Sequence, residues 1–431
     1  TIQMQNNNFT CLPNQPSSFT FLDFCHGITT CLISSFGCPQ YLHASETQYL
    51  TDLINQWSPN CLPTNWTIAG VDEACNTPFE GVTCSEYWTL SDIDLYLPPG
   101  VTCLSVSVPP SLFDAPYLNG ITIDGYNFEG PLPATLSTTN VSSITLANMF
   151  ITDPIPPINK SKLLYLDLSG NSIEKPPKTE VFDRASLFLL DLSFNPITGD
   201  LSFLSGLEPM SLNISRCSFS GEISFITMRD SIANIIDISF NQLTGSIPSA
   251  LLTMDASTIV MKNNQLSGSI NIGTSVYSAS VLDLSNNQLS GTLTTSIYNH
   301  NSIVLDNNRF TGSIPDIGSF AFNTQLSIRN NSLTGDIPVS LSRNVNTVIL
   351  QLDDNPDMSG VIPEEITAMT QLKTFTFTGT KLKCPTTQSW EEWANTVSDI
   401  SCNLSGSVGS SGSSKGEGSS NDEGSSNDEG S

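Results

Sequence analysis

The sequence has few basic residues, very few histidines and no long hydrophobic run, and each scarcity excludes a class of protein. Lys and Arg number 15 against 41 Asp and Glu, a formal charge of -26, which repels nucleic acid and anionic membranes. The three histidines, His26, His43 and His300, lie far apart, so no catalytic constellation can be assembled from recognisable motifs. No apolar run reaches the roughly 18 residues of a membrane span. We therefore expect no nucleic-acid partner, no membrane span, no catalytic or metal site and no cofactor.

Cysteine, by contrast, is abundant and unevenly placed. The chain has 11 cysteines, eight of them before residue 104, which is typical of disulfide-bonded caps in an oxidising compartment. The chain begins at Thr1 without a charged and apolar leader, so we expect that a signal peptide has been removed. These features predict an extracellular protein, either secreted or held at the cell surface or cell wall. The cysteines expected to form disulfides are Cys11, Cys25, Cys31, Cys38, Cys61, Cys75, Cys84, Cys103, Cys384 and Cys402.

A short motif recurs along the chain, with clean copies in IDISFNQLTGSIP from Ile236 and LDLSNNQLSGTL from Leu282. Two apolar residues flank one polar residue in each copy, the period-two pattern of a strand with one buried face. One copy cannot bury its own leucines, so the copies must stack into a solenoid with a continuous parallel sheet. The motif's Asn position recurs every 21 to 25 residues, at Tyr126, Met149, Asn171, Asn195, Cys217, Asn241, Asn264, Asn287, Asn308, Asn331, Asn355 and Thr380.

The Asn position is predicted to point inward and to satisfy backbone groups at the turn that leaves each strand. Tyr126, Met149 and Thr380 depart from Asn near the ends of the array, where repeats are commonly atypical because they meet the caps. Cys217 occupies the same position in its repeat. It is therefore predicted to be a free, buried thiol, which leaves ten cysteines to pair.

The segment LTGSIP after Asn241 and its relatives resemble the plant-type leucine-rich-repeat consensus LxxNxLxGxIP. Residues 49–57 before Cys61, and FEGVTC ending at Cys84, are similar to the N-terminal cap of that family. The resemblance covers about residues 49–383. Polygalacturonase-inhibiting proteins and the ectodomains of plant receptor kinases and receptor-like proteins share this architecture. The resemblance implies recognition of a protein, peptide or glycan by the concave sheet.

The predicted fold class is an α/β repeat solenoid, a leucine-rich-repeat horseshoe or superhelix of about 12 repeats with disulfide-bonded caps. We divide it into a Cys-rich extension (1–48), an N-terminal cap (49–118), the solenoid (119–383), a C-terminal cap (384–403) and a tail (404–431). In the C-terminal cap, Ser389 and Glu392 have the capping-box spacing of a short helix. The tail is nearly all Gly, Ser, Asp, Glu and Asn, so we expect a disordered tether.

Outward positions of the repeats predict the ligand-binding face. These positions carry a stripe of acidic residues, which favours a basic ligand. A solvated run of charges that belongs to the repeat consensus explains the same residues equally well. Phe194 and Phe240 stand directly before the Asn position and are predicted to be exposed anchors. The stripe comprises Asp167, Asp191, Asp237, Asp283, Asp306, Asp353 and Asp354, relieved by Arg216, Lys262 and Arg329. The predicted ligand-binding residues are Asp191, Phe194, Arg216, Asp237, Phe240, Lys262, Asp283, Asp306 and Arg329.

Two further patterns concern the surface. Candidate glycosylation sites are Asn8, Asn65, Asn140, Asn159, Asn213, Asn330 and Asn403. Asn213 and Asn330 are expected at outward strand positions, where glycans would obstruct the sheet.

A ladder of hydroxyls precedes the repeat glycine, at Thr198, Ser220, Thr244, Ser267, Ser290, Thr311, Thr334 and Ser359. This ladder suggests ice or crystal-surface binding, or simply supports a second short strand by local hydrogen bonds.

The leading hypothesis is a recognition protein, receptor-like or inhibitor-like, that binds a protein, peptide or glycan through its concave sheet. The alternative is a structural or adhesive surface glycoprotein that self-associates, with the solenoid as a rod and the tail as a spacer. Ice or crystal-surface binding is a minor alternative. An enzyme is not expected.

Overall fold

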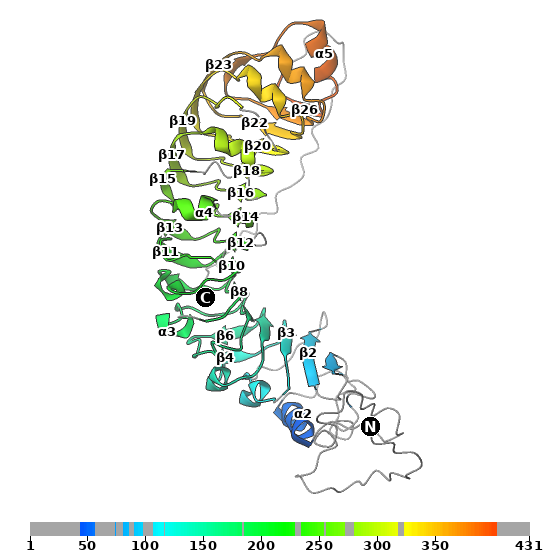
Figure 1. Cartoon of the computed structure of the whole chain (residues 1–431), viewed down its shortest axis with the longest axis vertical. Coiled ribbons are helices and arrows are strands. Elements are labelled where there is room, and N and C mark those ends of the chain that lie inside the picture. Colours follow the sequence, from blue (N-terminus) through cyan, green and yellow to red (C-terminus); the bar gives the residue numbers. More distant parts are fainter. Residues whose placement is uncertain are drawn as a thin grey trace, which may run out of the picture.

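The chain forms a curved, elongated solenoid in the computed structural model (Figure 1). The structure describes residues 44–56, 74, 81–85, 90–97, 107–115, 117–182, 185–228, 234–253, 256–271, 280–317 and 323–402. The tail, most of the N-terminal extension and several predicted sites lie outside these ranges. Those sites are Cys11, Cys25, Cys31, Cys38, Cys61, Cys75, Cys103, Asn8, Asn65 and Asn403.

A 15-stranded sheet of the described residues lines the concave side of the curve (Figure 1), with β1 and β2 antiparallel and every later pair parallel. Each repeat contributes one strand, because its central apolar residue is buried while the residues beside it face outward, as Leu282 is in β16. The strands are β1 (Val82–Cys84), β2 (Leu90–Tyr96), β3 (Gly120–Asp124), β5 (Ser143–Ala147), β7 (Tyr165–Asp167), β8 (Leu189–Asp191), β10 (Ser211–Asn213), β12 (Asn234–Asp237), β14 (Ala256–Val260), β16 (Val281–Asp283), β18 (Ser302–Val304), β20 (Gln325–Ser327), β22 (Ile349–Gln351), β24 (Thr374–Thr376) and β26 (Asp399–Ile400). The predicted repeat solenoid is confirmed.

A second set of short parallel strands follows the first along the solenoid. They are β4 (Glu129–Pro131), β6 (Phe150–Thr152), β9 (Thr198–Gly199), β11 (Ser218–Glu222), β13 (Gln242–Thr244), β15 (Ser267–Ser269), β17 (Gln288–Thr292), β19 (Arg309–Gly312), β21 (Ser332–Gly335), β23 (Asp357–Val361) and β25 (Lys381–Lys383). The hydroxyl ladder lies on these strands, and Ser220 and Thr311 donate to the carbonyls of Gly199 and Gly291, both at 3.4 Å. This placement confirms that the ladder supports a second strand.

Short helices complete the repeats and the caps. They are α2 (Ala44–Gln56), α3 (Thr179–Phe182), α4 (Ser249–Thr253) and α5 (Gln388–Ala394), with 3₁₀ helices η3 (Pro110–Phe113), η4 (Ala134–Ser137), η5 (Ser202–Leu204), η6 (Thr295–Asn299), η7 (Val339–Arg343) and η8 (Glu364–Ala368). Helix α2 docks on the first strands because the buried Glu46 carboxylate accepts the Leu90 N–H at 2.8 Å. Since α2 begins at Ala44, it crosses the expected boundary between residues 48 and 49.

The inward asparagines hold the turns together, as predicted. The Nδ2 of Asn241 donates to the carbonyls of Ile214 (2.8 Å), Ile238 (3.1 Å) and Ser239 (3.2 Å), and its Oδ1 accepts the Phe219 N–H at 3.0 Å. Each bond reaches a backbone group that the solenoid removes from water. The same pattern recurs at Asn171, Asn195, Asn264, Asn287, Asn308, Asn331 and Asn355.

The C-terminal cap contains the predicted short helix, but its N-terminus differs from the prediction. The N-cap of α5 is Thr387, whose side chain accepts the Trp390 N–H at 3.4 Å, and Ser389 lies inside the helix. Ser389 donates instead to Glu364 of the preceding repeat. Thr387 donates to the same Glu364 carboxylate at 2.9 Å, so both hydroxyls tie the start of α5 to the preceding repeat. Cys384 and Cys402 form a disulfide across this cap, and Cys84 is also disulfide-bonded.

Cys217 is the free cysteine of the described residues, and it occupies an Asn position of the ladder. Its Sγ donates to the carbonyl of Leu192 at 3.3 Å, one of the roles that the Asn amide has elsewhere. Burial raises the pKa of the Cys217 thiol to about 11. The predicted free thiol is confirmed, but the side chain is half-buried rather than fully buried as predicted.

We expect Cys217 to resist alkylation by iodoacetamide in the native protein at pH 8, because the thiolate is the reactive form and the pKa of this thiol lies well above 8. In denaturant the same thiol should react at the rate of an ordinary cysteine. Intact-mass measurements under both conditions check this. Rapid native labelling of Cys217 at pH 8 would contradict the raised pKa of this half-buried thiol.

Candidate concave recognition site

One residue in each repeat, directly before the inward Asn position, adopts a left-handed backbone conformation. We call the non-glycine members of this series the turn row; it comprises Asn148, Phe194, Arg216, Phe240, Asn263, Asn286, Asn307, Asn330 and Asp354, with φ between 48° and 56°. The row follows the edge of the concave sheet where the chain leaves each strand. Each backbone N–H donates to the next repeat, as Arg216 does to the Ser239 carbonyl at 2.9 Å. The turn row is therefore a regular, rigid edge.

Three consecutive members of the turn row form an exposed stack, which we call the Phe–Arg–Phe stack. The guanidinium carbon of Arg216 lies 5.2 Å from the ring centroid of Phe194 and 4.2 Å from that of Phe240. The two rings remain 58% and 36% exposed. Cation–π contacts of this kind contribute roughly 0.5–1 kcal/mol at exposed sites. The stack is an ordered apolar and cationic surface open to solvent.

The residue types in the stack are unusual for this backbone conformation. Asn tolerates the left-handed region and occupies the turn row at Asn148, Asn263, Asn286, Asn307 and Asn330. Phe194, Arg216 and Phe240 have no such preference, and the left-handed conformation costs such residues on the order of 1–2 kcal/mol each. Backbone strain of this kind gathers at functional sites. The stack is therefore not explained by the requirements of the turn.

The outward aspartates are engaged by their own turns. Asp237 accepts from the Ser239 N–H at 2.9 Å and from its hydroxyl at 2.6 Å, and both bonds use the same carboxylate oxygen, Oδ1. Asp191 accepts from Ser193 and from the Asn213 Nδ2, both at 2.8 Å. Partial burial raises the pKa of Asp191, and the charge of Asp167 raises it further. The aspartates of the acidic stripe thus hold the turns at the sheet edge through hydrogen bonds, and they also give this edge a negative charge.

Two of the three cations on the concave face are neutralised by neighbouring repeats. Lys262 pairs with Asp283 at 3.2 Å. Arg329 pairs with Asp306 at 2.7 Å, and that carboxylate also accepts the Ser327 hydroxyl at 2.7 Å. Asp306 is only 3% exposed, so it does not present a free carboxylate to a ligand as predicted.

The predicted binding residues thus separate into two groups. Phe194, Arg216 and Phe240 meet in the stack, with Asp191 and Asp237 on the strands beside it. Lys262, Asp283, Asp306 and Arg329 form structural ion pairs further along. Asp306 and Arg329, expected at outward strand positions, lie just beyond strands β18 and β20 because those strands end at Val304 and Ser327. The same holds for Arg216, Lys262, Asp353 and Asp354.

Sequence reasoning missed the amide half of the turn row. Asn307 donates to the Asn286 Oδ1 and Asn330 to the Asn307 Oδ1, both at 2.8 Å, which makes an exposed amide ladder. It also missed Ile235, whose outward side chain on β12 is 43% exposed. The repeated residue before each inward Asn was the signal that could have revealed the ladder.

The asparagines of the four described sequons differ in their hydrogen bonds and in their positions in the repeat. Asn213 uses its Nδ2 to donate to Asp191 and Ser193, and Asn159 donates to the Thr139 carbonyl at 2.7 Å. Asn330 belongs to the turn row rather than to an outward strand position as expected. Asn140 is exposed, in the turn before β5.

His300 follows η6 in a bend of its repeat and is buried. The described residues contain no group of three or more His, Cys, Asp or Glu side chains placed to hold a metal ion. Among the same residues, no helix has the length and apolar character needed to cross a bilayer.

The leucine-rich-repeat family model matches residues 278–300. Among solved structures, PEPR1 with AtPEP1 is similar over 79% of this chain and 56% of that chain, with 23% identity and a TM-score of 0.54. A TDR receptor is similar over 72% and 55%, with 18% identity and a TM-score of 0.60. A plant ice-binding protein matches over 85% and 100%, with 17% identity and a TM-score of 0.49, too low to support an argument. Comparison with curated proteins found no match by sequence.

These similarities define the fold. The chain is a leucine-rich-repeat solenoid, and its predicted resemblance to plant-type receptor ectodomains is confirmed at the level of the fold. It covers little more than half the length of the two receptor structures. What such receptors bind is therefore a matter for proposal here.

Proposed function

We propose that this protein is an extracellular recognition protein that binds a protein or peptide ligand on its concave face, and that it has no catalytic activity. The observation that carries the proposal is the Phe–Arg–Phe stack, three strained and exposed residues whose types the turn does not require. Aromatic residues and arginine are the commonest anchors of protein interfaces.

The chemistry around the stack favours a polypeptide over a neutral glycan. The guanidinium of Arg216 has no ion-pair partner among the described residues, while the Asp237 carboxylate bonds to Ser239 through Oδ1. Apolar ring surface, a cation and carboxylates therefore lie within neighbouring repeats. A ligand with both apolar and charged side chains satisfies all three.

The test is capture from the secreted proteins of the source organism on immobilised protein. We expect the wild-type chain to retain a ligand that the Phe194→Ala/Phe240→Ala variant does not retain. Phe150→Ala is the matched control, because Phe150 is a 53% exposed aromatic on β6, away from the concave sheet. Equal recovery by the wild-type and doubly substituted chains would refute the proposed site.

The outward carboxylate of Asp237 should affect the rate of association more than the stability of the complex. If the ligand is basic, Asp237→Asn should slow its association about twofold to threefold at low salt, with little change in dissociation, because surface charges mainly steer encounter. Surface plasmon resonance at two salt concentrations measures this. Glu208→Gln removes an exposed charge elsewhere and serves as the control. An acceleration in Asp237→Asn would indicate an acidic ligand.

A further inference from the structure

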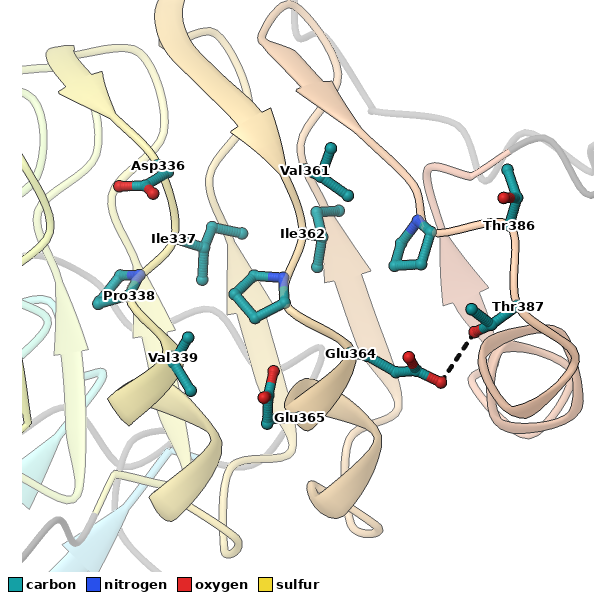
Figure 2. A pocket seen from close by; sticks show the side chains of 12 residues that line it. Asp336, Ile337, Pro338, Val339, Val361, Ile362, Glu364, Glu365, Thr386 and Thr387 are labelled. Atoms are coloured by element: carbon teal, nitrogen blue, oxygen red, sulfur yellow. Dashed lines mark hydrogen bonds between the residues drawn. The ribbon is translucent and has the colours of Figure 1, made fainter.

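A shallow groove lies on the second-strand side of the last repeats, away from the concave sheet. It has a volume of about 520 Å³ and runs across three successive coils, between the ends of β21 and β23 and the segment before α5 (Figure 2). Its floor is formed by Ile337 and Ile362, which belong to the buried core. Pro338, Pro363 and Pro385 line it, one from each coil.

The groove exposes aliphatic side chains where the solenoid is otherwise polar. Val339 is 54% exposed and Val361 is 60% exposed. In the repeat pattern, Val361 directly follows the repeat glycine, a position that holds Ser246, Ser269, Thr292, Ser313 and Asp336 in other repeats. Neither valine is needed by the repeat, because polar residues at the equivalent positions build the same coil. The exposed apolar surface of the groove is thus not a requirement of the repeat.

Carboxylates surround this apolar surface. Asp336 and Glu365 are exposed and take part in no ion pair among the described residues. Glu364 accepts hydrogen bonds from Ser389 and from Thr387, the latter shown in Figure 2, and these bonds lower the pKa of its carboxyl and keep it ionised. The groove therefore combines an aliphatic floor and walls with three negative charges.

Charge decides which occupant fits. The chain's own residues 403–431 contain five Asp and Glu and one Lys, so the acidic groove repels them. A second copy of the chain, with a formal charge of -26, is disfavoured for the same reason. A basic segment gains attraction from all three carboxylates.

We propose that this groove is a second docking site, which binds a basic polypeptide segment with aliphatic side chains from a partner protein. The aliphatic side chains pack on Val339, Val361 and the prolines, and the cationic groups pair with Asp336, Glu364 and Glu365. This site is separate from the concave face and does not depend on ligand recognition there. It lets the solenoid hold two partners at once.

The test uses three synthetic probes with the full chain: a peptide of alternating leucine and lysine, one of leucine and glutamate, and one of serine and lysine. We expect saturable binding of the leucine–lysine peptide alone, measured by calorimetry at physiological salt. Val361→Ser/Glu365→Gln should weaken this binding roughly tenfold, through lost apolar contact and lost charge.

The control variant is Val345→Ser/Glu208→Gln, which makes the same two changes at exposed residues outside the groove. Its affinity for the leucine–lysine peptide should equal that of the wild type. Lys383→Glu, on the strand in register with Val361, should strengthen binding severalfold. The proposal is overturned if no probe binds saturably, if the leucine–glutamate peptide binds as tightly, or if groove and control variants lose equal affinity.

Discussion

Asn241→Leu should lower the free energy of unfolding by about 3 kcal/mol, since several buried backbone groups lose their partners and each unsatisfied group costs about 1–3 kcal/mol. Leucine has a similar volume but no polar atoms. The Phe219 N–H and the carbonyls of Ile214 and Ile238 all bond to Asn241 inside the coil. The loss should extend to neighbouring repeats, because each coil is stabilised by contacts with the next.

Gln242→Leu is the matched control, because the adjacent Gln242 side chain is exposed on β13 and the same substitution there removes no buried bond. Urea denaturation followed by circular dichroism gives the two midpoints. Hydrogen exchange should show lost protection around β11 and β13 in Asn241→Leu alone. Coincident midpoints would mean that the inward ladder does not support the solenoid.

Phe240→Ala should weaken binding of the captured ligand at least about tenfold, and Phe194→Ala/Phe240→Ala about a hundredfold, since buried aromatic anchors commonly contribute 2 kcal/mol or more. Phe240 has the shorter contact with Arg216, at 4.2 Å. Its removal takes away ring surface and also releases the guanidinium that the rings hold in place. Both effects should raise the dissociation rate.

Surface plasmon resonance on the whole chain measures these affinities. The melting temperatures of the variants should match the wild type or rise, because Ala is no worse than Phe in the left-handed conformation and the rings are exposed. Phe150→Ala should bind as the wild type does. Affinity that stays within twofold in every variant would remove the stack from the binding site and favour the rod-like structural role.

The coils were predictable because their determinants are local. Leu282 and its equivalents alternate with polar residues, and Asn287 falls at a fixed distance after them, so a buried strand and an inward amide follow directly. Cys217 could be assigned as a free thiol on the same grounds. The exposure of Phe194 and Phe240 followed from their place before the inward residue.

The electrostatics of the concave face were not predictable, because they depend on side chains about 20 residues apart that meet only in the folded register. Asp306 resembles Asp283 in the sequence, yet it stands two residues later in its repeat, beyond the end of β18, and is enclosed by Arg329 and Ser327. The N-cap of α5 was misplaced for a similar reason, since Glu364 of the preceding repeat accepts hydrogen bonds from both Thr387 and Ser389. The aliphatic groove was likewise not predictable, because its lining residues come from three successive coils.

The most direct test of the central claim is site-specific photocrosslinking of the bound ligand. With photoreactive p-benzoylphenylalanine in place of Phe194, irradiation should join the captured ligand covalently to position 194, in the turn after β8. The same photoreactive residue in place of Phe150, an aromatic of comparable exposure on the second set of strands, should give no crosslink. A crosslink at position 150 with none at position 194 would place the ligand away from the concave face and contradict the proposed recognition site.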